Sequence, residues 1–407
     1  MRVFLAHPGA RNHYEVARAL ESQGMLASFL TDFYRLPPAP VSRLGSMSRL
    51  PSQFAWLKAY SERSAGLPAE HVSVSRRMQF ASILRKFTRS PQSIALADRL
   101  VAKAMTIAAV SRKFSNAQVV YGYSGSAAYM FKAGKAAGKT LILDQASATI
   151  KTANAIMEQA SQDWPAWPFE RVPGAYQEME EIEYELADKI LSPSSFVRHS
   201  LVSSGVDDGK IFHNPYSISA PFDGTPMNLE PGDVRNNRPL NLLFVGRFCL
   251  QKGAPYLLEA LKRIDSRHMN LTVIGSTSGV EKLIEGHQSR VSFRGHLPRS
   301  EVRRAYSEAD FLCLPSVCEG FGMVQLEALQ TGVPVIASTH CGDVAEHGLS
   351  GYRVPAMSSD AIAETLENIM AARDSITAMR RAALKRAQEF SFEAFARRLH
   401  FVVAGGQ

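Results

Sequence analysis

The sequence has few cysteines. It contains four in 407 residues, and no two of them have the spacing Cys-x-x-Cys. This excludes a disulfide-rich scaffold, and it gives no pair from which a cysteine zinc site could be built. We expect Cys249, Cys313, Cys318 and Cys341 to be ordinary thiols in the core or near a site, and we expect no bound metal.

Long apolar runs are also missing. No uninterrupted apolar stretch approaches the roughly 18 residues that a membrane-spanning helix needs. The first residues, MRVFLAHPGARNH, form a short apolar segment without the small-residue cleavage site of a signal peptide. We therefore expect a cytoplasmic protein.

Acidic residues are scarce in one part of the chain. The formal net charge is +8, and residues 41–113 hold thirteen Lys or Arg against three Asp or Glu. Such a region favours an anionic partner. A nucleic-acid partner would require stacking aromatics among the basic residues or a known motif, and neither is present. We expect no nucleic acid, and we consider peripheral contact with an anionic membrane instead.

The chain is long enough for two domains of roughly 200 residues each. Short apolar runs alternate with helical patterns, and this alternation occurs in two series, as expected for two parallel sheets with helical crossovers. The expected strands are 3–6, 27–31, 118–123, 140–144 and 189–192 in the first series, and 241–246, 271–275, 290–295, 311–315 and 333–338 in the second.

A linker divides the two series. Residues 214–239 are rich in Pro, Gly, Asn and Asp and have no periodic face. The predicted fold is α/β, with two doubly wound, Rossmann-like domains at 1–213 and 240–390 that face each other across a cleft. We expect residues 391–407 to form a helix that packs back toward the first domain, and the acidic helix within 159–185 to present a solvated face.

The segment CEGFGMVQLEALQTG places two glutamates after an apolar strand. Glu319 lies on a glycine-bearing turn and Glu327 lies in a short helix. The carboxyl end of a parallel strand is where open α/β sheets bind ligands. A buried carboxylate costs several kcal/mol unless it is hydrogen-bonded, and the amides of residues 320–324 at a helix start favour an anion.

The segment VGRFCLQKG follows another strand of the same sheet. Arg247 and Lys252 should therefore lie at the same edge as the two glutamates, where two cations could bind a diphosphate without a metal. Taken alone, they could equally be solvated loop cations. Together with the carboxylates, they suit a nucleotide diphosphate that carries a hydroxyl-rich group.

These motifs resemble a known family. EGFGMVQLEAL with its two glutamates eight residues apart, GRFCLQKG, FRGHLPRSEVRRAYSEAD and TGVPVIAS with CGDVAE are similar to the donor domain of retaining glycosyltransferases of family 4, which have the GT-B fold. The similarity runs over about 241–355, and weaker similarity is present in the first half.

The resemblance implies roles for individual residues. Glu327 would bind the donor ribose, Glu319 the donor sugar beside the anomeric carbon, and Arg247 with Lys252 the diphosphate. Gly9 would let a loop of the first domain approach the phosphates. The other implied donor contacts are Gly295, His296 and Leu297 beside the nucleobase, and backbone groups of Gly320, Phe321, Gly322, Met323 and Val324.

One position departs from the family pattern. Many members carry a histidine after the strand that corresponds to 140–144, and here the residues are Asp144 and Gln145. Asp144 could orient or deprotonate the acceptor hydroxyl, or it could cap the end of the strand. His7, Arg11 and His13 are further acceptor-side candidates, with ordinary loop roles as the alternative.

The expected function is transfer of a sugar, with retention and without a metal or cofactor, from a nucleotide diphosphate to a glycan or lipid-linked acceptor. The resemblance implies bacterial surface or exported polysaccharide synthesis, including lipopolysaccharide. No candidate nucleophile is indicated, so the leaving phosphate is expected to take the acceptor's proton. The alternatives are an anion-binding module without transferase activity and a phosphorylase of the same fold.

A basic segment offers a possible membrane contact. Phe80, Ile83, Leu84 and Phe87 have the spacing of one helical stripe, and Arg85, Lys86 and Arg89 project from the other side. The stripe could pack on its own domain while the cations meet water. Alternatively, this surface contacts anionic lipid on the inner face of the cytoplasmic membrane.

Overall fold

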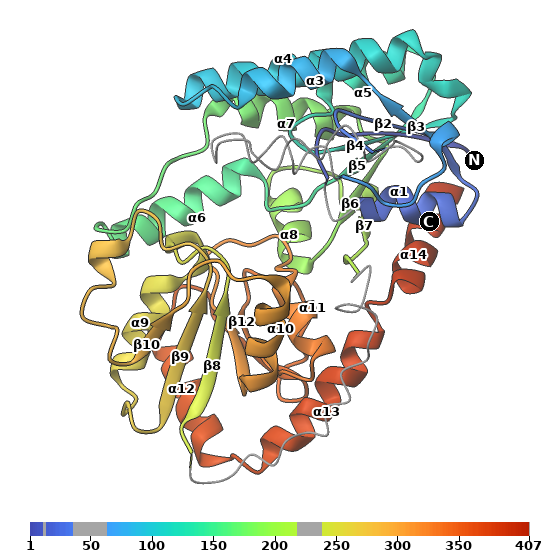
Figure 1. The fold of residues 1–407 in the computed structure, drawn as a ribbon. Coiled ribbons are helices and arrows are strands. Elements are labelled where there is room, and N and C mark those ends of the chain that lie inside the picture. The colour runs from blue at the N-terminus through green and yellow to red at the C-terminus, as the bar shows by residue number, and fades with distance from the viewer. Residues whose placement is uncertain (11–13, 36–62, 218–237, 407) are drawn as a thin grey trace, which may run out of the picture.

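The computed structural model describes residues 1–10, 14–35, 63–217 and 238–406. Two α/β domains follow one another along the chain, blue to green and then yellow to red (Figure 1). Most of the expected linker, together with Arg11 and His13, lies outside the described residues.

The first domain contains a seven-stranded parallel sheet in the order β3-β2-β1-β4-β5-β6-β7. Its strands are β1 (Val3–Ala6), β2 (Leu26–Thr31), β3 (Val72–Val74), β4 (Val119–Tyr123), β5 (Thr140–Asp144), β6 (Lys189–Ser192) and β7 (Ile211–His213). The central strands β1 and β4 are buried along their whole length, because helices cover both faces of the sheet.

The second domain contains a six-stranded parallel sheet in the order β10-β9-β8-β11-β12-β13. Its strands are β8 (Leu240–Val245), β9 (Met269–Ile274), β10 (Val291–Phe293), β11 (Phe311–Leu314), β12 (Val335–Ser338) and β13 (Gly351–Val354). With two doubly wound parallel sheets, the predicted fold class is confirmed.

Helices connect the strands and cover the sheets. They are α1 (Glu15–Ser22), α3 (Arg76–Arg85), α4 (Pro91–Ser111), α5 (Ala128–Ala136), α6 (Ile150–Asp163), α7 (Gly174–Leu186), α8 (Ser195–Ser203), α9 (Ala254–Lys262), α10 (Arg299–Glu308), α11 (Val324–Gln330), α12 (Ser359–Ala371), α13 (Ser375–Gln388) and α14 (Phe392–Ala404). None of the helices in the described ranges is long and apolar enough to cross a bilayer.

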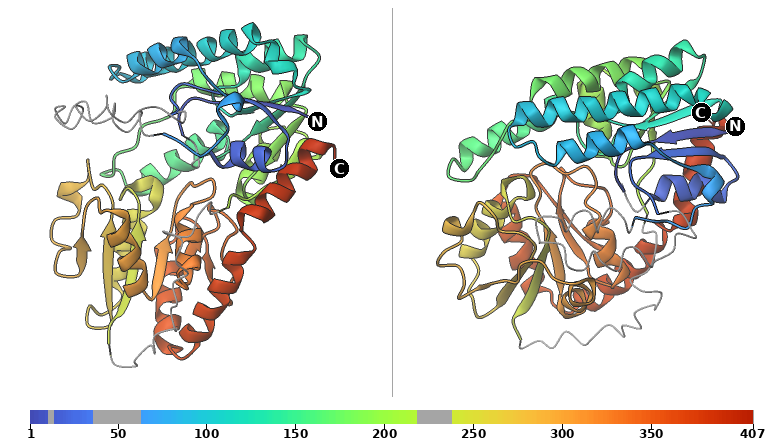
Figure 2. Two further views of the ribbon diagram at one scale, coloured as in Figure 1. Left: turned by 45° about the vertical axis from the view of Figure 1, so that its right-hand side comes forward. Right: turned by 45° about the horizontal axis from the view of Figure 1, so that its top comes forward.

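The last helix returns to the first domain. The two termini lie close together there, with α14 beside α1 (Figures 1 and 2). The Lys189 ammonium at the start of β6 donates to the Val402 carbonyl at 2.7 Å. The chain therefore passes from the first domain, described up to residue 217, to the second domain, described from residue 238, and it returns to the first domain between α13 and α14.

The acidic helix α7 has the expected solvated face, with Glu178, Glu181 and Glu185 exposed, but its other face is buried. In α7, Glu180 and Glu183 are almost fully buried. Glu183 accepts three backbone N–H groups at the start of α5, from Gly125, Ala127 and Ala128 at 2.7 to 3.1 Å. The first N–H groups of a helix have no partner within it, so a carboxylate from a neighbouring helix satisfies them.

Candidate functional site

The loops that follow β5 and β11 meet between the two domains. A side chain at Gly320 would place its Cβ 1.9 Å from the Ala146 carbonyl oxygen, so only glycine fits this approach. The carbonyl of the same glycine accepts a hydrogen bond from the hydroxyl of Ser194, in the first domain, at 2.7 Å. The glycine-bearing turn of the second domain is thus in direct contact with the carboxyl edge of the first sheet.

Glu319, on this glycine-bearing turn, forms an ion pair with Lys252. Lys252 lies in a 3-10 turn (Leu250–Lys252), and Gly253 follows it with φ 75°. A Cβ at Gly253 would lie 1.9 Å from the Pro315 carbonyl oxygen. The glycine therefore brings the loop of Lys252 against the loop of Glu319, which joins two residues that are 67 positions apart.

Arg247 lies on the same loop as Lys252 and is exposed. It follows Gly246. A Cβ at Gly275 would lie 2.0 Å from the Gly246 carbonyl oxygen, so the loops after β8 and β9 are tightly packed. The two cations predicted from the sequence therefore share one edge of the second sheet, one paired with a carboxylate and one directed to solvent.

Glu327 projects from α11 and is paired with a tyrosine of α10. The Tyr306 hydroxyl donates to a Glu327 carboxylate oxygen at 2.9 Å, and Tyr306 is fully buried. Burial raises the pKa of Glu327, while the Tyr306 hydrogen bond and the Arg299 charge lower it. Sequence reasoning missed Tyr306, because nothing near it in the chain indicates a partner 21 residues away.

The turn before α11 presents backbone donors. Within the described residues, the amides of Phe321, Gly322 and Met323 donate to no protein oxygen. Gly322 has φ 78°, and a Cβ there would be 2.8 Å from a Leu314 methyl group. The turn is therefore tightly packed on the side of Leu314, and these amides stay candidates for binding an anion.

The segment proposed for the nucleobase lies at the end of β10. Gly295 has φ 63°, and its carbonyl accepts the Gly275 amide at 2.8 Å. His296 is exposed and Leu297 is half-buried. These three residues lie beside the loop after β9, which packs in turn against the loop that carries Arg247.

Gly9 lies on the loop after β1. It has φ 82°, and among the described residues no atom beyond its chain neighbours lies within 4 Å of the position of a Cβ. Its amide donates to Asp32 at 2.9 Å. His7, one turn earlier, is 1% exposed and packs with its ring 5.0 Å from those of Phe29 and Tyr123.

Asp144 and Gln145 are committed to protein partners. The Asp144 carboxylate accepts from the hydroxyls of Tyr121 at 2.7 Å and Tyr216 at 3.1 Å, and it is 3% exposed. The Gln145 amide nitrogen donates to Ser147 and Glu180, each at 2.9 Å. This arrangement favours the alternative in which Asp144 caps the end of its strand.

The thiols of Cys313, Cys318 and Cys341 are buried, and Cys249 is half-buried. Burial raises the pKa of Cys318 to about 11 and that of Cys341 to about 12, so neither is a reactive thiolate near neutral pH. Over the described ranges, the structure contains no cluster of three His, Cys, Asp or Glu side chains that could hold a metal ion.

Comparison with known proteins supports the resemblance. Residues 239–372, which include both site glutamates and both cations, match the family model of glycosyl transferases group 1. The resemblance to glycosyltransferases is confirmed over this segment.

Relatives among known proteins match the chain in part. The D-inositol 3-phosphate glycosyltransferase of Kribbella flavida is 31% identical over 237 residues, which cover 53% of this chain and 55% of that protein. The amylovoran biosynthesis glycosyltransferase AmsK of Erwinia amylovora is 28% identical over 195 residues, or 44% and 46% of the two chains. The chain thus spans about half the length of these relatives.

A solved structure matches the whole chain. HepE of Anabaena, solved in complex with UDP, superposes with a TM-score of 0.63 at 15% identity, covering 99% of this chain and 100% of that one. This likeness shows the fold of the whole chain, which is the GT-B fold of glycosyltransferases.

Proposed function

We propose that the protein is a retaining, metal-independent glycosyltransferase that moves a sugar from a nucleotide diphosphate to a hydroxyl of a glycan or lipid-linked acceptor. The observation that carries this proposal is the ion pair of Glu319 and Lys252 at the edge of the second sheet, inside the matched segment. Arg247 lies on the loop of Lys252, and Glu327 lies on the helix that follows Glu319. The amylovoran relative and the UDP-bound neighbour support a uridine diphosphate donor and a role in bacterial surface or exported polysaccharide synthesis.

The chemistry follows from the charges at this edge. Cleavage of the bond between the anomeric carbon and the phosphate oxygen develops negative charge on the diphosphate. Lys252, Arg247 and the free amides of the turn would stabilise that charge. Glu319 would accept sugar hydroxyls next to the reacting carbon, and the leaving phosphate oxygen would take the acceptor's proton on the same face.

Asp144 is a poor candidate for a covalent nucleophile. It is 3% exposed, and both of its carboxylate oxygens accept hydrogen bonds from buried tyrosines, which lower their nucleophilicity. This supports direct transfer over a covalent glycosyl-enzyme intermediate, with retention as its result.

The proposal is tested by incubating the protein with UDP-, GDP- and ADP-sugars and measuring the nucleotide diphosphate that is released. We expect slow hydrolysis of one donor class. Phosphorolysis of a glycan by inorganic phosphate would favour the phosphorylase alternative. An anion-binding module would turn over no donor.

A first prediction concerns the ribose carboxylate. Tyr306→Phe removes the hydroxyl that stabilises ionised Glu327, so the pKa of Glu327 should rise further. Because the ionised form accepts the ribose hydroxyls, UDP affinity should fall by a factor of about 10, from the ~1.5 kcal/mol of a hydrogen bond to a charged group. The fall should be larger at acidic pH, and calorimetric titration with UDP at several pH values measures it.

The matched control is Tyr176→Phe, which removes another hydroxyl that donates to a carboxylate, here Asp98 at 2.6 Å. It should leave UDP binding and its pH dependence unchanged. Equal UDP affinity in Tyr306→Phe and in the unsubstituted protein at every pH would show that Tyr306 does not tune this site.

The proposal includes peripheral contact with an anionic membrane, through a surface that we call the α3-α4 face. The apolar stripe of α3 is exposed, with Phe80 65%, Leu84 42% and Phe87 67% accessible. The side of α3 that packs on the domain carries Met78, Ala81 and Ser82 instead. The structure therefore disagrees with the alternative in which the stripe is covered by its own domain.

The neighbouring helix extends this surface. On α4, Leu96, Leu100, Ile107 and Val110 are exposed at 45 to 61%, at spacings that place them on one helical face. The helices α3 and α4 lie together along one end of the molecule (Figures 1 and 2). Exposed apolar residues gathered on two neighbouring helices favour an interaction site.

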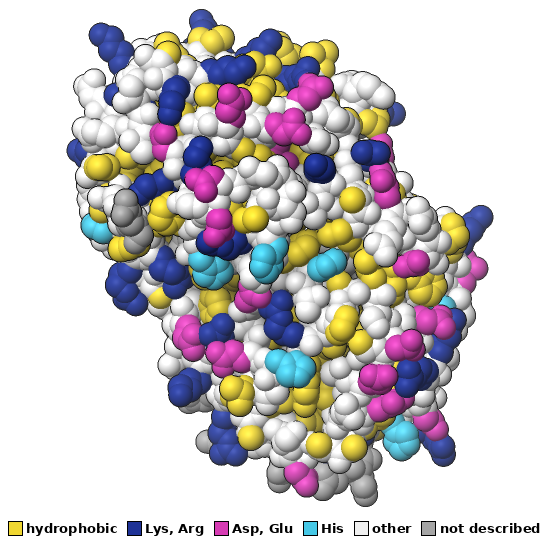
Figure 3. All heavy atoms as spheres, turned by 180° about the vertical axis from the view of Figure 1, so that it is seen from behind, with side chains coloured by type: hydrophobic (Ala, Val, Ile, Leu, Met, Phe, Trp, Pro, Cys, Tyr) yellow, Lys and Arg dark blue, Asp and Glu magenta, His cyan; other side chains and the backbone are white. Residues whose placement is uncertain are grey.

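The charge of the surface indicates what it contacts. Residues 76–113 hold nine Lys or Arg and one acidic residue, Asp98, which pairs with Arg85. Seen from behind, that end of the molecule shows Lys and Arg side chains beside hydrophobic ones (Figure 3). Exposed apolar side chains flanked by cations suit the surface of an anionic bilayer.

A second prediction tests this contact. Phe80→Gln with Phe87→Gln should reduce sedimentation with anionic vesicles at least tenfold, because a fully buried Phe contributes about 1.5–3 kcal/mol. Arg85, Lys86 and Arg89 together replaced by Gln should weaken it less, since each exposed cation adds about 1 kcal/mol and Arg85 is already paired. Added salt should weaken the contact as well.

The control pair is Leu349→Gln with Phe401→Gln, two exposed apolar residues away from the α3-α4 face. It should sediment like the unsubstituted protein, and donor hydrolysis should be intact in all variants. Equal sedimentation of all variants, binding to zwitterionic vesicles alone, or a stable dimer that the Phe substitutions dissociate would contradict the membrane contact.

A further inference from the structure

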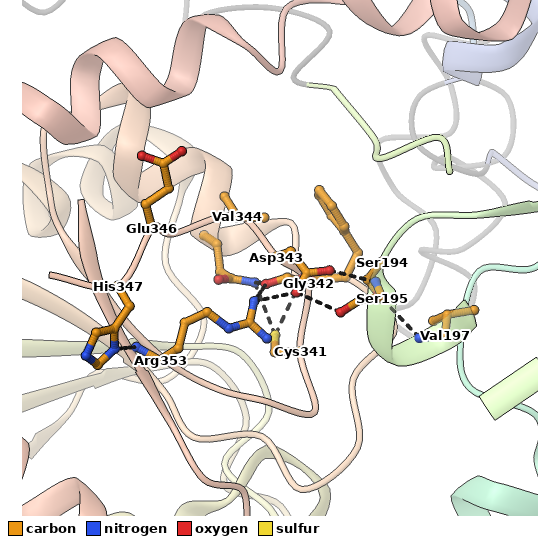
Figure 4. A network of polar contacts seen from close by, with 12 residues as sticks. Ser194, Ser195, Val197, Cys341, Gly342, Asp343, Val344, Glu346, His347 and Arg353 are labelled. Atoms are coloured by element: carbon orange, nitrogen blue, oxygen red, sulfur yellow. Dashed lines mark hydrogen bonds and ion pairs between the residues drawn. The ribbon is translucent and has the colours of Figure 1, made fainter. Parts of the chain in front are cut away.

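The first turn of α8 contacts the second domain through three consecutive residues. The Ser195 amide and hydroxyl donate to the Asp343 carboxylate at 2.6 and 2.9 Å (Figure 4). Ser194 donates to the Gly320 carbonyl at 2.7 Å. The ring of Phe196 stacks on that of His340, with centroids 4.7 Å apart and an interplanar angle of 17°.

Asp343 is held from its own domain as well. Arg353 pairs with its carboxylate at 2.7 Å (Figure 4), and Arg386 donates to its backbone carbonyl at 3.2 Å. The first N–H groups of α8 have no acceptor within the helix, and a negative charge near a helix start is favourable. A residue of the second domain thus completes a helix of the first.

The same contacts reach the turn that carries Glu319. The Glu319 amide donates to the His340 carbonyl at 3.0 Å, and the Gly342 amide donates to the Phe321 carbonyl at 3.0 Å. A Cβ at Gly342 would lie 2.4 Å from the Phe321 carbonyl oxygen. Residues 340–343 therefore pack against the turn that carries Glu319, and α8 contacts residues 340–343 from the other domain.

We propose that Ser194, Ser195 and Asp343 are positioning residues for the proposed transfer. Their contacts across the domain boundary hold the turn of Glu319 in the geometry needed for reaction, and these contacts exist only while the two domains are together. The inference rests on the proposed function. Because Arg247 and Glu327 lie on other elements, losing these contacts should lower turnover more than nucleotide binding, which the amides of this turn would also support.

The decisive variant is Ser195→Pro. Proline is well tolerated at the first position of a helix, and Ser194 has φ −153° and ψ 161°, an extended conformation that suits the residue before a proline. The change removes both donors to Asp343. We expect kcat for transfer to fall about tenfold or more, as for the loss of hydrogen bonds to a charged group, while UDP affinity measured by calorimetry falls by a smaller factor.

Two comparisons separate positioning from loss of structure. Ser195→Thr keeps both donors and should retain the kcat of the unsubstituted protein. Asp343→Ala removes the contact with Ser195 and also the ion pair with Arg353, so it should impair kcat at least as much as Ser195→Pro. The double variant should be no worse than Asp343→Ala alone, because the contact with Ser195 is already lost in it. Asp360→Ala removes a carboxylate that pairs with Arg263 on the surface of the second domain, and it should have no effect.

A readout that does not depend on activity completes the test. Amide hydrogen exchange in residues 196–198 and 340–343 should be faster in Ser195→Pro and unchanged in Ser195→Thr. Unaltered exchange and kcat in Ser195→Pro, or a fall in UDP affinity as large as the fall in kcat, would overturn the inference. Absence of nucleotide binding in the unsubstituted protein would instead refute the proposed function, and the exchange rates would still report on the contact.

Discussion

Glu319→Ala is expected to abolish sugar transfer, with a loss of about 10³-fold or more in kcat, or roughly 4 kcal/mol of transition-state stabilisation. Glu319 lies on the turn that meets the first domain, next to the place where the anomeric carbon would lie, and it pairs with Lys252. Its removal takes away the acceptor for the sugar hydroxyls and leaves the Lys252 ammonium without its partner. The initial rate of transfer, measured with saturating donor, gives the effect.

The companion variant Glu327→Ala should behave differently. Glu327 lies further along α11 with Tyr306, so its loss should mainly weaken donor binding and change kcat little. Glu308→Ala removes an exposed carboxylate that pairs with Arg304 and serves as the control. If Glu319→Ala and Glu327→Ala both keep the turnover and donor affinity of the unsubstituted protein, the assignment of the two glutamates is wrong.

Arg247→Ala and Lys252→Ala should each lose about 2–4 kcal/mol of transition-state stabilisation, the range for removing a donor aimed at developing charge. The expected fall in kcat/KM is therefore about 30- to 1,000-fold. Lys252 is the more informative of the two, because burial lowers the pKa of its ammonium and a partly buried cation interacts more strongly with a diphosphate than an exposed one. Kinetics with varied donor measure both effects.

The same experiment addresses the metal. If the two cations neutralise the diphosphate, activity should persist in EDTA, whereas strict dependence on an added divalent ion would contradict this role. Lys262→Ala and Arg267→Ala remove exposed cations that pair with Glu259 and Asp265 in the same domain. They should leave kcat/KM unchanged.

The sequence was most informative about buried strands. Strands such as β4 and β11 are covered on both faces, so their residues form continuous apolar runs that can be identified without a structure. The strands β3, β7 and β13 were not predicted. They have three or four residues each and lie at sheet edges, where a short segment leaves little apolar pattern.

Contacts between distant residues could not be predicted in this way. Lys252 and Glu319 were each predicted to be site residues. Their pairing, however, depends on the close approach of the Gly253 backbone to the Pro315 carbonyl. Ser195 and Asp343 are 148 positions apart in the chain, and neither has a local pattern that indicates the other. The buried Glu183 was mistaken for a solvated residue because its partners are backbone amides.

The central claim is that the edge formed by Arg247, Lys252, Glu319 and Glu327 binds the diphosphate of a nucleotide donor. The most direct test is calorimetric titration of the purified protein with UDP in EDTA, with GDP and ADP in parallel. The account predicts saturable one-site binding of one nucleotide that is much weaker in Lys252→Ala and unchanged in Lys262→Ala. Absence of saturable binding for all three nucleotides, or equal binding by Lys252→Ala and the unsubstituted protein, would contradict it.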